Sequence, residues 1–471
     1  MIGLEVHAEL KTLTKMFCSC KNDADEERPN VNICPVCMAH PGTLPVVNKK
    51  AVESVVKVWL SVNGNIADFT EFDRKNYFYP DIPKGYQISQ YKYPIVSGGE
   101  LGGFKLTRVH LEEDTANSKH DRGDFSLIDY NRAGVPLMEL VTETHTFPSA
   151  EEAGLSASKF AKEFQLLLQY LGVSEANMEK GEMRVEANIS TTDDEKKFGT
   201  KVEVKNLNSF KSAERAINFE VKRMVALLEE GKGADIVQET RGWDEMKNKT
   251  FSQRSKENSA DYRYFPDPDI PKFKLHEVFD LEEMKKTLPE LPWQKRKRYK
   301  EQFGIKDEDV ESFVNDFTLS GFFEDVITDL GTDKELAKTA SNYITSDLVG
   351  QMKKKGDVFK YPHSYHFAEL IKMVSDCTIN SRAAKDILEI LADEDDSPKE
   401  IAEKKGMIQK TDENEVRAIV QGVIDLSPKI VTDYKGGKEN ALMSLVGQVM
   451  KETKGSANPV IVKKLLVELL K

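Results

Sequence analysis

The chain has 471 residues, of which 39% are hydrophobic and 31% charged, and its formal net charge is −12. At roughly 100–200 residues per domain, this length predicts several domains. No apolar run approaches the roughly 20 residues of a membrane-spanning helix, and five cysteines are too few for a disulfide scaffold. The first residues lack the pattern of a secretory signal, and the acidic charge excludes a uniformly basic nucleic-acid-binding protein. We therefore expect a cytoplasmic, multidomain protein without a membrane segment.

The first predicted element is a β-strand over residues 2–10. Its apolar residues alternate with Glu5, His7 and Glu9. Because successive side chains of a strand point to opposite faces, these three polar residues share one face.

Four cysteines follow with the spacing C-x-C-x13-C-x-x-C: Cys18, Cys20, Cys34 and Cys37. Four thiolates so close together in a cytosolic chain are typical of a tetrahedral structural zinc site, here a knuckle over residues 18–37. The alternative is a set of free thiols beneath a loop. A redox pair at Cys34 and Cys37 would need βαβ surroundings, which the neighbouring sequence lacks. The zinc prediction concerns stability and positioning and not catalysis.

Three further strands show the same alternation of apolar and polar residues. The polar residues of each strand lie on one face, and they are Arg108, His110 and Glu112 in residues 106–114, Arg184, Glu186 and Asn188 in residues 182–190, and Lys201, Glu203 and Lys205 in residues 200–208.

A solvated sheet face would give the same alternation, and for any single strand it is the simpler interpretation. The composition of these faces favours another one. Carboxylates and imidazole bind divalent metals, and Mg²⁺ is held by a few carboxylates together with substrate phosphates. Arginine and lysine on the same surface would neutralise a transferring phosphoryl group. If the strands are neighbours, they form a surface for ATP and Mg²⁺. The chain lacks the phosphate-binding loop G-x-x-x-x-G-K-[ST], so we expect any nucleotide to bind to the sheet and not to a helix N-terminus.

Two amphipathic helices are predicted in the first part of the chain. One begins at Ser149, where Glu152 completes a capping box, and ends at Gly172. The other runs from Ser209 to Gly231. We expect both helices to pack against the sheet, and we assign them no chemistry.

Beyond about residue 291, glycine and proline become rarer and helical spacing dominates. Residues 288–300 are the predicted junction, and a second boundary is expected near residues 392–400. There Ser397 and Glu400 would form a capping box around Pro398. The predicted domains are therefore residues 1–290, 291–395 and 396–471.

Residues 397–471 carry 13 Lys and Arg against 10 Asp and Glu, so the tail has a net charge of +3 in an acidic chain. Its lysines could contact phosphates, or they could simply form a solvated helix face. The candidates are Lys451, Lys454, Lys463 and Lys464.

Long strings of the chain match one family. They are IGLEVHAELKTLTKMFCSC (2–20), NICPVCMAHPGTLPVVNKKAVE (32–53), FDRKNYFYPDIPKGYQISQY (72–91), RVHLEEDTANSKH (108–120), EVKNLNSF (203–210), DYRYFPDPDIP (261–271) and ALMSLVGQVMKETKGSANPVIVKKLL (441–466). Together they resemble the B-type subunits of the aspartyl/glutamyl-tRNA amidotransferases, the GatB family. The last string resembles that family's C-terminal domain, which is similar to the stand-alone YqeY proteins.

The resemblance implies an α+β fold. Residues 1–290 would form an antiparallel-sheet cradle similar to glutamine synthetase, residues 291–395 an all-α domain, and residues 396–471 a small helical YqeY-like tail that binds tRNA. It also implies an ATP-dependent carbon–nitrogen ligase with glutamine as amido donor. ATP and Mg²⁺ would phosphorylate the side-chain carboxylate of Glu-tRNA(Gln) or Asp-tRNA(Asn), and ammonia would convert the acyl phosphate to the amide. The ammonia would come from an amidase subunit, and a small clamp subunit would complete a heterotrimer.

The resemblance also suggests site residues. Glu5, His7, Glu112 and Glu186 carry over as the Mg²⁺-binding set, with Glu113 or Asp114 as accessories. Many family members have Asp where this chain has Glu186, whose reach is longer. The candidates for contacts with phosphate or substrate are Arg184, Asn188, Lys205 and Lys84. Among the neighbouring aromatic residues, Tyr77, Phe78 or Tyr79 could stack on a tRNA base, or they could be core residues beside a turn.

Two rival functions remain open from the sequence. A zinc-stabilised tRNA-binding scaffold without catalysis would not explain Glu, His and Arg on three strand faces. A free-standing ligase for a small amino acid would not explain the long helical C-terminal half.

Overall fold

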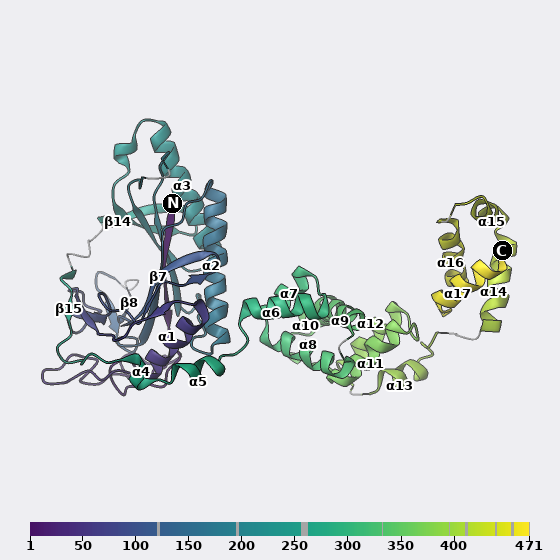
Figure 1. Cartoon of the computed structure of the whole chain (residues 1–471), viewed down its shortest axis with the longest axis horizontal. Helices are drawn as coiled ribbons and strands as arrows, with labels where there is room; N and C mark the ends of the chain where they lie inside the picture. The colour runs from purple at the N-terminus through teal and green to yellow at the C-terminus, as the bar shows by residue number, and fades with distance from the viewer. Residues whose placement is uncertain are drawn as a thin grey trace. The chain divides into compact units, whose positions relative to one another are not determined.

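The computed structural model describes most of the chain. The chain divides into two compact units, Met1–Pro292 and Trp293–Lys471 (Figure 1). The described residues are 1–119, 123–194, 197–255, 262–331, 333–394, 396–409, 413–438, 440–453 and 456–470. The first unit contains a large sheet with flanking helices, and the second is helical. The predicted α+β class is confirmed. The further division at residues 395–396 stays a prediction.

In the described part of the chain, ten strands form the large sheet, in the order β14-β13-β12-β11-β1-β10-β7-β5-β2, with β6 paired to β7. Their bounds are β1 (Ile2–Glu9), β2 (Asn65–Ile66), β5 (Val96–Ser97), β6 (Glu100–Leu101), β7 (Phe104–Glu113), β10 (Pro136–Thr142), β11 (Met183–Ile189), β12 (Val202–Leu207), β13 (Glu239–Asp244) and β14 (Lys249–Ser255). The strand β1 therefore lies in the middle of the sheet, between β10 and β11.

Among the described strand pairs of this sheet, all are antiparallel except β12 and β13, which are parallel. The expectation of a wholly antiparallel sheet is wrong at this pair. The reason is the connection: helix α3 (Phe210–Glu229) lies between the two strands in the chain and returns it to the same end of the sheet.

Two helices pack together beside the sheet (Figure 1): α2 (Ala150–Tyr170), which contacts β1, and α3, which contacts β11 and β12. The predicted caps are present, since the Ser149 hydroxyl accepts from the Glu152 amide at 3.1 Å and Ser209 caps α3 in the same way. A side chain at Gly154 would meet the Glu214 carbonyl oxygen at 2.7 Å, so this glycine permits the close approach of the two helices.

The apolar residues of β1 are fully buried: Ile2, Leu4, Val6 and Ala8 have no exposed surface. The same alternation holds in β11, where Met183, Val185, Ala187 and Ile189 are buried. Because one strand face is buried in this apolar core, the other face carries the polar residues.

A second, three-stranded sheet lies in the first unit, in the order β15-β3-β4. Its strands are β3 (Asp73–Asn76), β4 (Tyr86–Ser89) and β15 (Phe265–Pro266). Hydrogen bonds tie β4 to β7: the Glu113 carboxylate accepts from the Ile88 amide at 3.0 Å, and the Glu113 carbonyl accepts from Gln87 Nε2 at 2.7 Å. Just after β4, Gln90 Oε1 accepts from the Leu111 amide at 3.0 Å. The remaining elements are α1 (Lys49–Val62), the hairpin of β8 (Asn117–Lys119) and β9 (Leu127–Asp129), and the short helices α4 (Leu275–Val278) and α5 (Leu281–Lys286).

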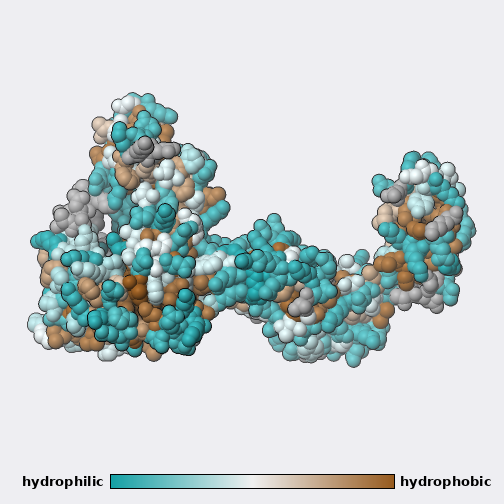
Figure 2. Space-filling view, viewed as in Figure 1, coloured by the Kyte–Doolittle hydropathy of each residue, from teal (hydrophilic) through white to brown (hydrophobic). Residues whose placement is uncertain are grey.

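The second unit is built from helices. Within its described residues they are α6 (Pro292–Arg298), α7 (Asp307–Val314), α8 (Phe317–Leu330), α9 (Lys334–Asn342), α10 (Val349–Lys355), α11 (Ser364–Ser375), α12 (Ser381–Leu391), α13 (Pro398–Lys404), α14 (Glu413–Leu426), α15 (Pro428–Lys435), α16 (Asn440–Glu452) and α17 (Pro459–Leu469). The surface around α6 to α8 is mainly hydrophilic in the view of Figure 2. In the part of the chain described, no helix combines the length and apolar character needed to span a bilayer.

The predicted capping box at the start of α13 is wrong in one respect. Pro398 does occupy the first turn, but the Ser397 hydroxyl does not cap the helix. It donates instead to a Glu369 carboxylate oxygen at 3.0 Å. The hydroxyl is thus oriented toward a carboxylate on a neighbouring helix and not toward the backbone amides of the first turn.

Candidate active site

The register of the sheet assembles polar residues into two adjacent rows on one face of four strands. Glu5 of β1 lies opposite Glu186 of β11. His7 of β1 lies opposite Glu139 of β10, which in turn lies opposite His110 of β7. Directly opposite residues of antiparallel strands point to the same face, so these side chains converge.

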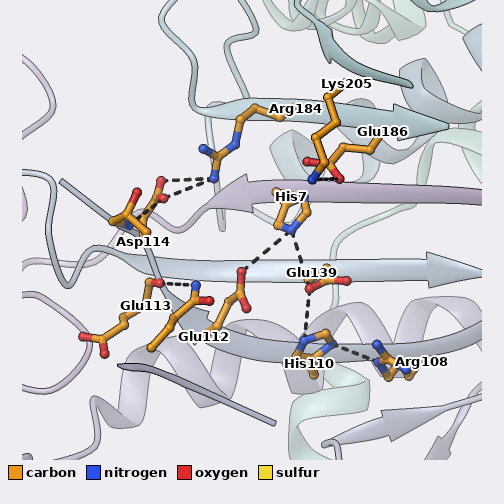
Figure 3. Close-up of polar contacts among 12 residues, drawn as sticks. His7, Arg108, His110, Glu112, Glu113, Asp114, Glu139, Arg184, Glu186 and Lys205 are labelled. Atoms are coloured by element: carbon orange, nitrogen blue, oxygen red, sulfur yellow. Dashed lines mark hydrogen bonds and ion pairs between the residues drawn. The ribbon is translucent and has the colours of Figure 1, made fainter. Parts of the chain in front are cut away.

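His7 lies in the middle of these polar side chains (Figure 3). Its Nε2 atom is 3.7 Å from Glu112 Oε1 and 3.5 Å from Glu139 Oε2, and His110 Nε2 is 3.2 Å from the same Glu139 oxygen. Burial alone would lower the pKa of His7, but its hydrogen bond to Glu139 and the nearby carboxylates raise it to about 9. Burial opposes ionisation of Glu139 as well, yet the two histidines hold its pKa well below the usual value.

Two buried atoms of this group have no hydrogen-bond partner among the described residues: His7 Nδ1 and Glu112 Oε2. Buried polar atoms are rarely left unsatisfied, and each exception calls for an explanation. His7, Glu112 and Glu139 can each offer one ligand atom, and these atoms all lie within 4.8 Å of one another. A bound cation or substrate would satisfy such a group.

Glu5, Glu186 and Glu203 form a second group with ligand atoms within 4.8 Å of one another. Lys205 Nζ is 2.7 Å from Glu186 Oε2, and Asn188 Nδ2 donates to Glu5 Oε1 at 2.7 Å. Burial, and then the carboxylates around it, raise the pKa of Glu5. Burial also disfavours ionised Glu186, but Lys205 and His7 lower its pKa. Carboxylates held this close repel one another, so the group is suited to a divalent cation.

A cleft of about 410 Å³ lies over this face. Glu5, His7, Glu139, Glu186 and Glu203 line it from the large sheet. Lys75 of β3 and the aromatic side chains of Tyr262 and Tyr264 line it from outside that sheet. The polar face is therefore partly enclosed, as a site for a charged substrate requires.

Two of the predicted contact residues are directed elsewhere. The Arg184 guanidinium contacts Asp114 at 3.2 Å (Figure 3), where Arg184 and then Arg132 lower the pKa of Asp114 against the effect of its burial. Lys84 Nζ is 2.7 Å from the Glu113 carboxylate, and these two residues line a small pocket beside the cysteines. Neither Arg184 nor Lys84 lines the cleft over the carboxylates. Glu113 is turned away because it follows Glu112 directly in the strand.

The structure adds three residues that the sequence did not single out as site residues: His110, Glu139 and Glu203. His110 and Glu203 stood on the predicted polar faces without a role. Glu139 gave almost no signal, since it is the one polar residue between Leu137 and Val141 on its face of β10.

The four cysteine side chains converge. Their sulfur atoms lie within 4.8 Å of one another, with Cys20 Sγ and Cys37 Sγ 3.9 Å apart. Four thiolates around one zinc at about 2.3 Å would be about 3.8 Å apart, so the spacing fits. The Cys34 amide donates to Cys37 Sγ at 3.2 Å, and a hydrogen bond from Cys18 lowers the pKa of Cys37 to about 5. This cluster could hold a metal ion.

Known proteins resemble the chain over its whole length. The family model described as "GatB/GatE catalytic domain" matches residues 1–279, and the one described as "GatB domain" matches residues 321–470. The chain is 43% identical over 482 residues to the B-type subunit of the aspartyl/glutamyl-tRNA(Asn/Gln) amidotransferase of Persephonella marina, covering 100% of this chain and 99% of that protein. The chain belongs to the GatB family.

Two other relatives give the same result. Identity is 44% over 483 residues to the same subunit of Caldanaerobacter subterraneus subsp. tengcongensis, covering 99% of this chain and 98% of the relative. It is 42% over 488 residues to the B-type subunit of the chloroplastic/mitochondrial glutamyl-tRNA(Gln) amidotransferase of Oryza sativa subsp. japonica, covering 100% of this chain and 87% of the relative. The family predicted from the sequence strings is confirmed.

In this GatB-family chain the aromatic segment after β3 is on the surface. Phe78 is 78% exposed and Tyr79 is 57% exposed. The Tyr79 ring stacks on that of Tyr77 with centroids 5.4 Å apart and planes 10° apart. The interpretation of Phe78 and Tyr79 as core residues is therefore wrong. Stacking on a tRNA base stays a prediction.

Proposed function

We propose that this chain uses ATP to phosphorylate the side-chain carboxylate of misacylated Glu-tRNA(Gln) or Asp-tRNA(Asn) on the polar face of the large sheet. The GatB family supplies the overall reaction, which is the tRNA-dependent amidation carried out by a glutamine-dependent carbon–nitrogen ligase. The observation that carries the proposal is that two clusters of metal-binding side chains lie on one sheet face beneath a cleft. They are the cluster of His7, Glu112 and Glu139 and the cluster of Glu5, Glu186 and Glu203. A purely structural surface has no need for so many buried like charges.

The donor set fits Mg²⁺. Mg²⁺ prefers oxygen ligands, and the orphaned Glu112 Oε2 is such an atom, whereas the orphaned His7 Nδ1 is a nitrogen. The proposed ligands are Glu5, His7, Glu112 and Glu186, now with Glu139 and Glu203. When bound, Mg²⁺ would neutralise the charge that develops on the transferring phosphoryl group. The proposal includes a cradle similar to that of glutamine synthetase, with this face as its concave surface.

The reaction requires no nucleophile from the chain. An oxygen of the substrate carboxylate attacks the γ-phosphorus of ATP, the bond to the β-phosphate oxygen breaks, and ADP leaves with the electron pair. Ammonia then attacks the acyl carbon, and phosphate departs. In this scheme the chain positions the reactants, and Lys205, held by Glu186, and Asn188, held by Glu5, fix the carboxylates at the cleft. The rings of Tyr262 and Tyr264 would limit the entry of water, which hydrolyses acyl phosphates.

The proposed partners are those that the family resemblance implies. We propose that ammonia is supplied by an amidase subunit and that a small clamp subunit joins the two in a heterotrimer. We further propose that residues 291–395 and the tail of residues 396–471 hold the tRNA. Lys451, Lys463 and Lys464 are the tail candidates in the described residues, and Lys454 lies outside them. The four-cysteine cluster would hold a structural zinc.

A trapping assay tests the proposal. The chain, purified with its amidase and clamp partners, is given γ-labelled ATP, Mg²⁺ and Glu-tRNA(Gln), while glutamine and ammonia are withheld. We expect a labelled acyl phosphate that hydroxylamine captures as the hydroxamate. Glu112→Gln should abolish formation of the acyl phosphate. The control, Glu143→Gln, changes an exposed carboxylate beyond the end of β10 and should leave formation of the acyl phosphate unchanged.

Two results would contradict the proposal. If Glu112→Gln amidates tRNA as fast as the unchanged complex, the carboxylate face is not the site of activation. If no label is captured from a complex that forms Gln-tRNA when glutamine is restored, and rapid-quench sampling also finds none, the chain would act as a tRNA-binding scaffold.

A further inference from the structure

Lys75 approaches the cleft from outside the large sheet. It belongs to β3, in the small three-stranded sheet, and it lines the cleft together with residues of β1, β10 and β11. Its side chain is half-buried. The sequence did not distinguish it, because it stands in the string FDRKN beside another basic residue and on no alternating strand face.

The ammonium of Lys75 is a charged group within a largely acidic cleft. It lies over the Tyr262 ring, 5.1 Å from the ring centroid. Burial would lower the pKa of Lys75, but the Glu112 carboxylate and then Tyr264 and Glu139 raise it far above the usual value. The lysine is therefore a cation, and the residues that keep it so belong to the group of His7, Glu112 and Glu139.

Lys75 differs from the other cations of this region in what it binds. Lys205 is held by Glu186 at 2.7 Å, and Arg184 is held by Asp114 at 3.2 Å. In the described part of the chain, the Lys75 ammonium forms no ion pair and no hydrogen bond, and a ring face is its contact. Its three N–H donors are thus available for an anion that enters the cleft.

The chemistry of the side chain is suited to a phosphoryl group. A lysine ammonium binds phosphate oxygens as a compact point charge with three donors. The position agrees, because Lys75 lines the same cleft as His7 and Glu139, whose group carries the orphaned atoms proposed to face the metal and its phosphates.

We propose that Lys75 is a catalytic residue that donates hydrogen bonds to the non-bridging oxygens of the γ-phosphoryl group while it moves from ATP to the substrate carboxylate. The inference rests on the proposed function and adds a residue to it. The new bond forms between a carboxylate oxygen and phosphorus, the bond from phosphorus to the ADP oxygen breaks, and ADP takes the electron pair. Lys75 keeps its protons and stabilises the charge on the oxygens.

The test compares Lys75→Met with Lys75→Arg in the complete complex. Single-turnover formation of labelled acyl phosphate is measured at saturating γ-labelled ATP and Glu-tRNA(Gln). Because Lys75→Met loses one preorganised charged donor, its transfer rate should be about 10²–10³-fold lower than that of the unchanged complex. The rate of Lys75→Arg should be at least about tenfold higher than that of Lys75→Met. The KM for Glu-tRNA(Gln) should change by less than about threefold, since the contact forms with the phosphoryl group. Lys92→Met, at an exposed lysine, is the matched control.

Several results would overturn the inference. An unchanged transfer rate in Lys75→Met would do so, and so would an unchanged rate with a raised KM for Glu-tRNA(Gln), which would place Lys75 on the carboxylate. If Tyr262→Leu reproduced the whole loss, Lys75 would act by supporting the aromatic wall. Thermal melting verifies folding, and Lys75→Gln provides the same comparison should the methionine variant be unstable. Absence of acyl phosphate in the unchanged complex would instead refute the proposed function itself.

Discussion

The polar sheet face and the four-cysteine cluster are both convergent sets of metal-binding side chains, but they are assembled in different ways. The cysteines come from one segment of 20 residues, and local turns bring their sulfur atoms together. The carboxylates and histidines come from β1, β7, β10, β11 and β12, and only strand register brings them together. Short-range order is enough for the first set, whereas the second requires most of the sheet.

The two sets also differ in their electrostatics. The sulfur cluster can be closed by one ion, with each thiol as a ligand. The sheet face keeps several carboxylates close together, with two buried atoms unsatisfied in the described structure and with a cleft above them. Like charges held together cost folding free energy, which is typical of a site that stabilises something other than the fold. We therefore expect mutations in the sheet face to change activity and mutations in the cysteine cluster to change stability.

After Glu112→Gln, the largest expected effect is that of Glu139→Gln. Glu139 pairs with both His7 and His110, so removing its charge alters the whole group on that side of the cleft. We expect acyl phosphate formation to fall by about 10³-fold, while far-ultraviolet circular dichroism stays unchanged. The rate is measured by single-turnover trapping. A fall of less than tenfold would show that Glu139 supports the fold and not the reaction.

Cys34→Ser should have the next largest effect, and on stability. Loss of one of four thiolates opens the metal site, so metal analysis should find less than about half an equivalent of zinc, against one equivalent in the unchanged chain. The free energy of unfolding should fall by at least about 2 kcal/mol, measured by urea titration. Cys377→Ser, outside the cluster, is the control. Equal zinc content in the two variants would contradict the zinc assignment.

Glu203→Gln sharpens the comparison within the sheet face. Glu203 belongs to the group of Glu5 and Glu186 but also accepts a hydrogen bond from Thr240 at 2.6 Å, which glutamine can keep. We expect acyl phosphate formation to fall by about tenfold, with an increased requirement for Mg²⁺. A Mg²⁺ titration of the rate is the measurement, and an unchanged midpoint would remove Glu203 from the ligand set.

The smallest effect is expected for Lys84→Met. Lys84 pairs with Glu113 beside Cys37 and does not line the cleft. The phosphoryl-transfer step should therefore slow by less than about threefold, because this ion pair, although its side chains are only 13% and 6% exposed, makes no contact with the reacting groups. Lys205→Met, which removes a cation from the cleft, is the comparison. A larger loss for Lys84 than for Lys205 would reverse the assignment of these two lysines.

Much of the fold could be predicted because its signals are local. The strands β1 and β11 alternate along their length, β7 and β12 alternate over part of theirs, and α2 and α3 begin at hydroxyl caps and end near glycines. The parallel pairing of β12 with β13 has no local signal, since it depends on where α3 returns the chain. The failed cap at Ser397 has a similar cause, because its acceptor Glu369 lies on another helix.

The site was predictable to the extent that its residues lie on alternating strands. Glu5, His7, Glu112 and Glu186 were found in this way together with the family strings. Glu139 was missed because its strand is apolar on both faces. Lys75, from the small sheet, was missed because nothing in the sequence links that sheet to the cleft. Lys84 was predicted to contact phosphate only because it stands in a string shared with the family (72–91). A shared string does not determine where a side chain points.

The central position of β1 has a consequence for how the protein is made. This strand is synthesised well before both of its neighbours, β10 and β11, which emerge from the ribosome only after α1 and most of the other described strands. Until then both of its edges lack partners, and its buried apolar face has nothing to cover it. Contacts so distant in sequence form slowly, and exposed edges promote aggregation. A growing chain would therefore benefit from chaperones until β11 has emerged, and catalytic competence begins only when the middle of the sheet closes.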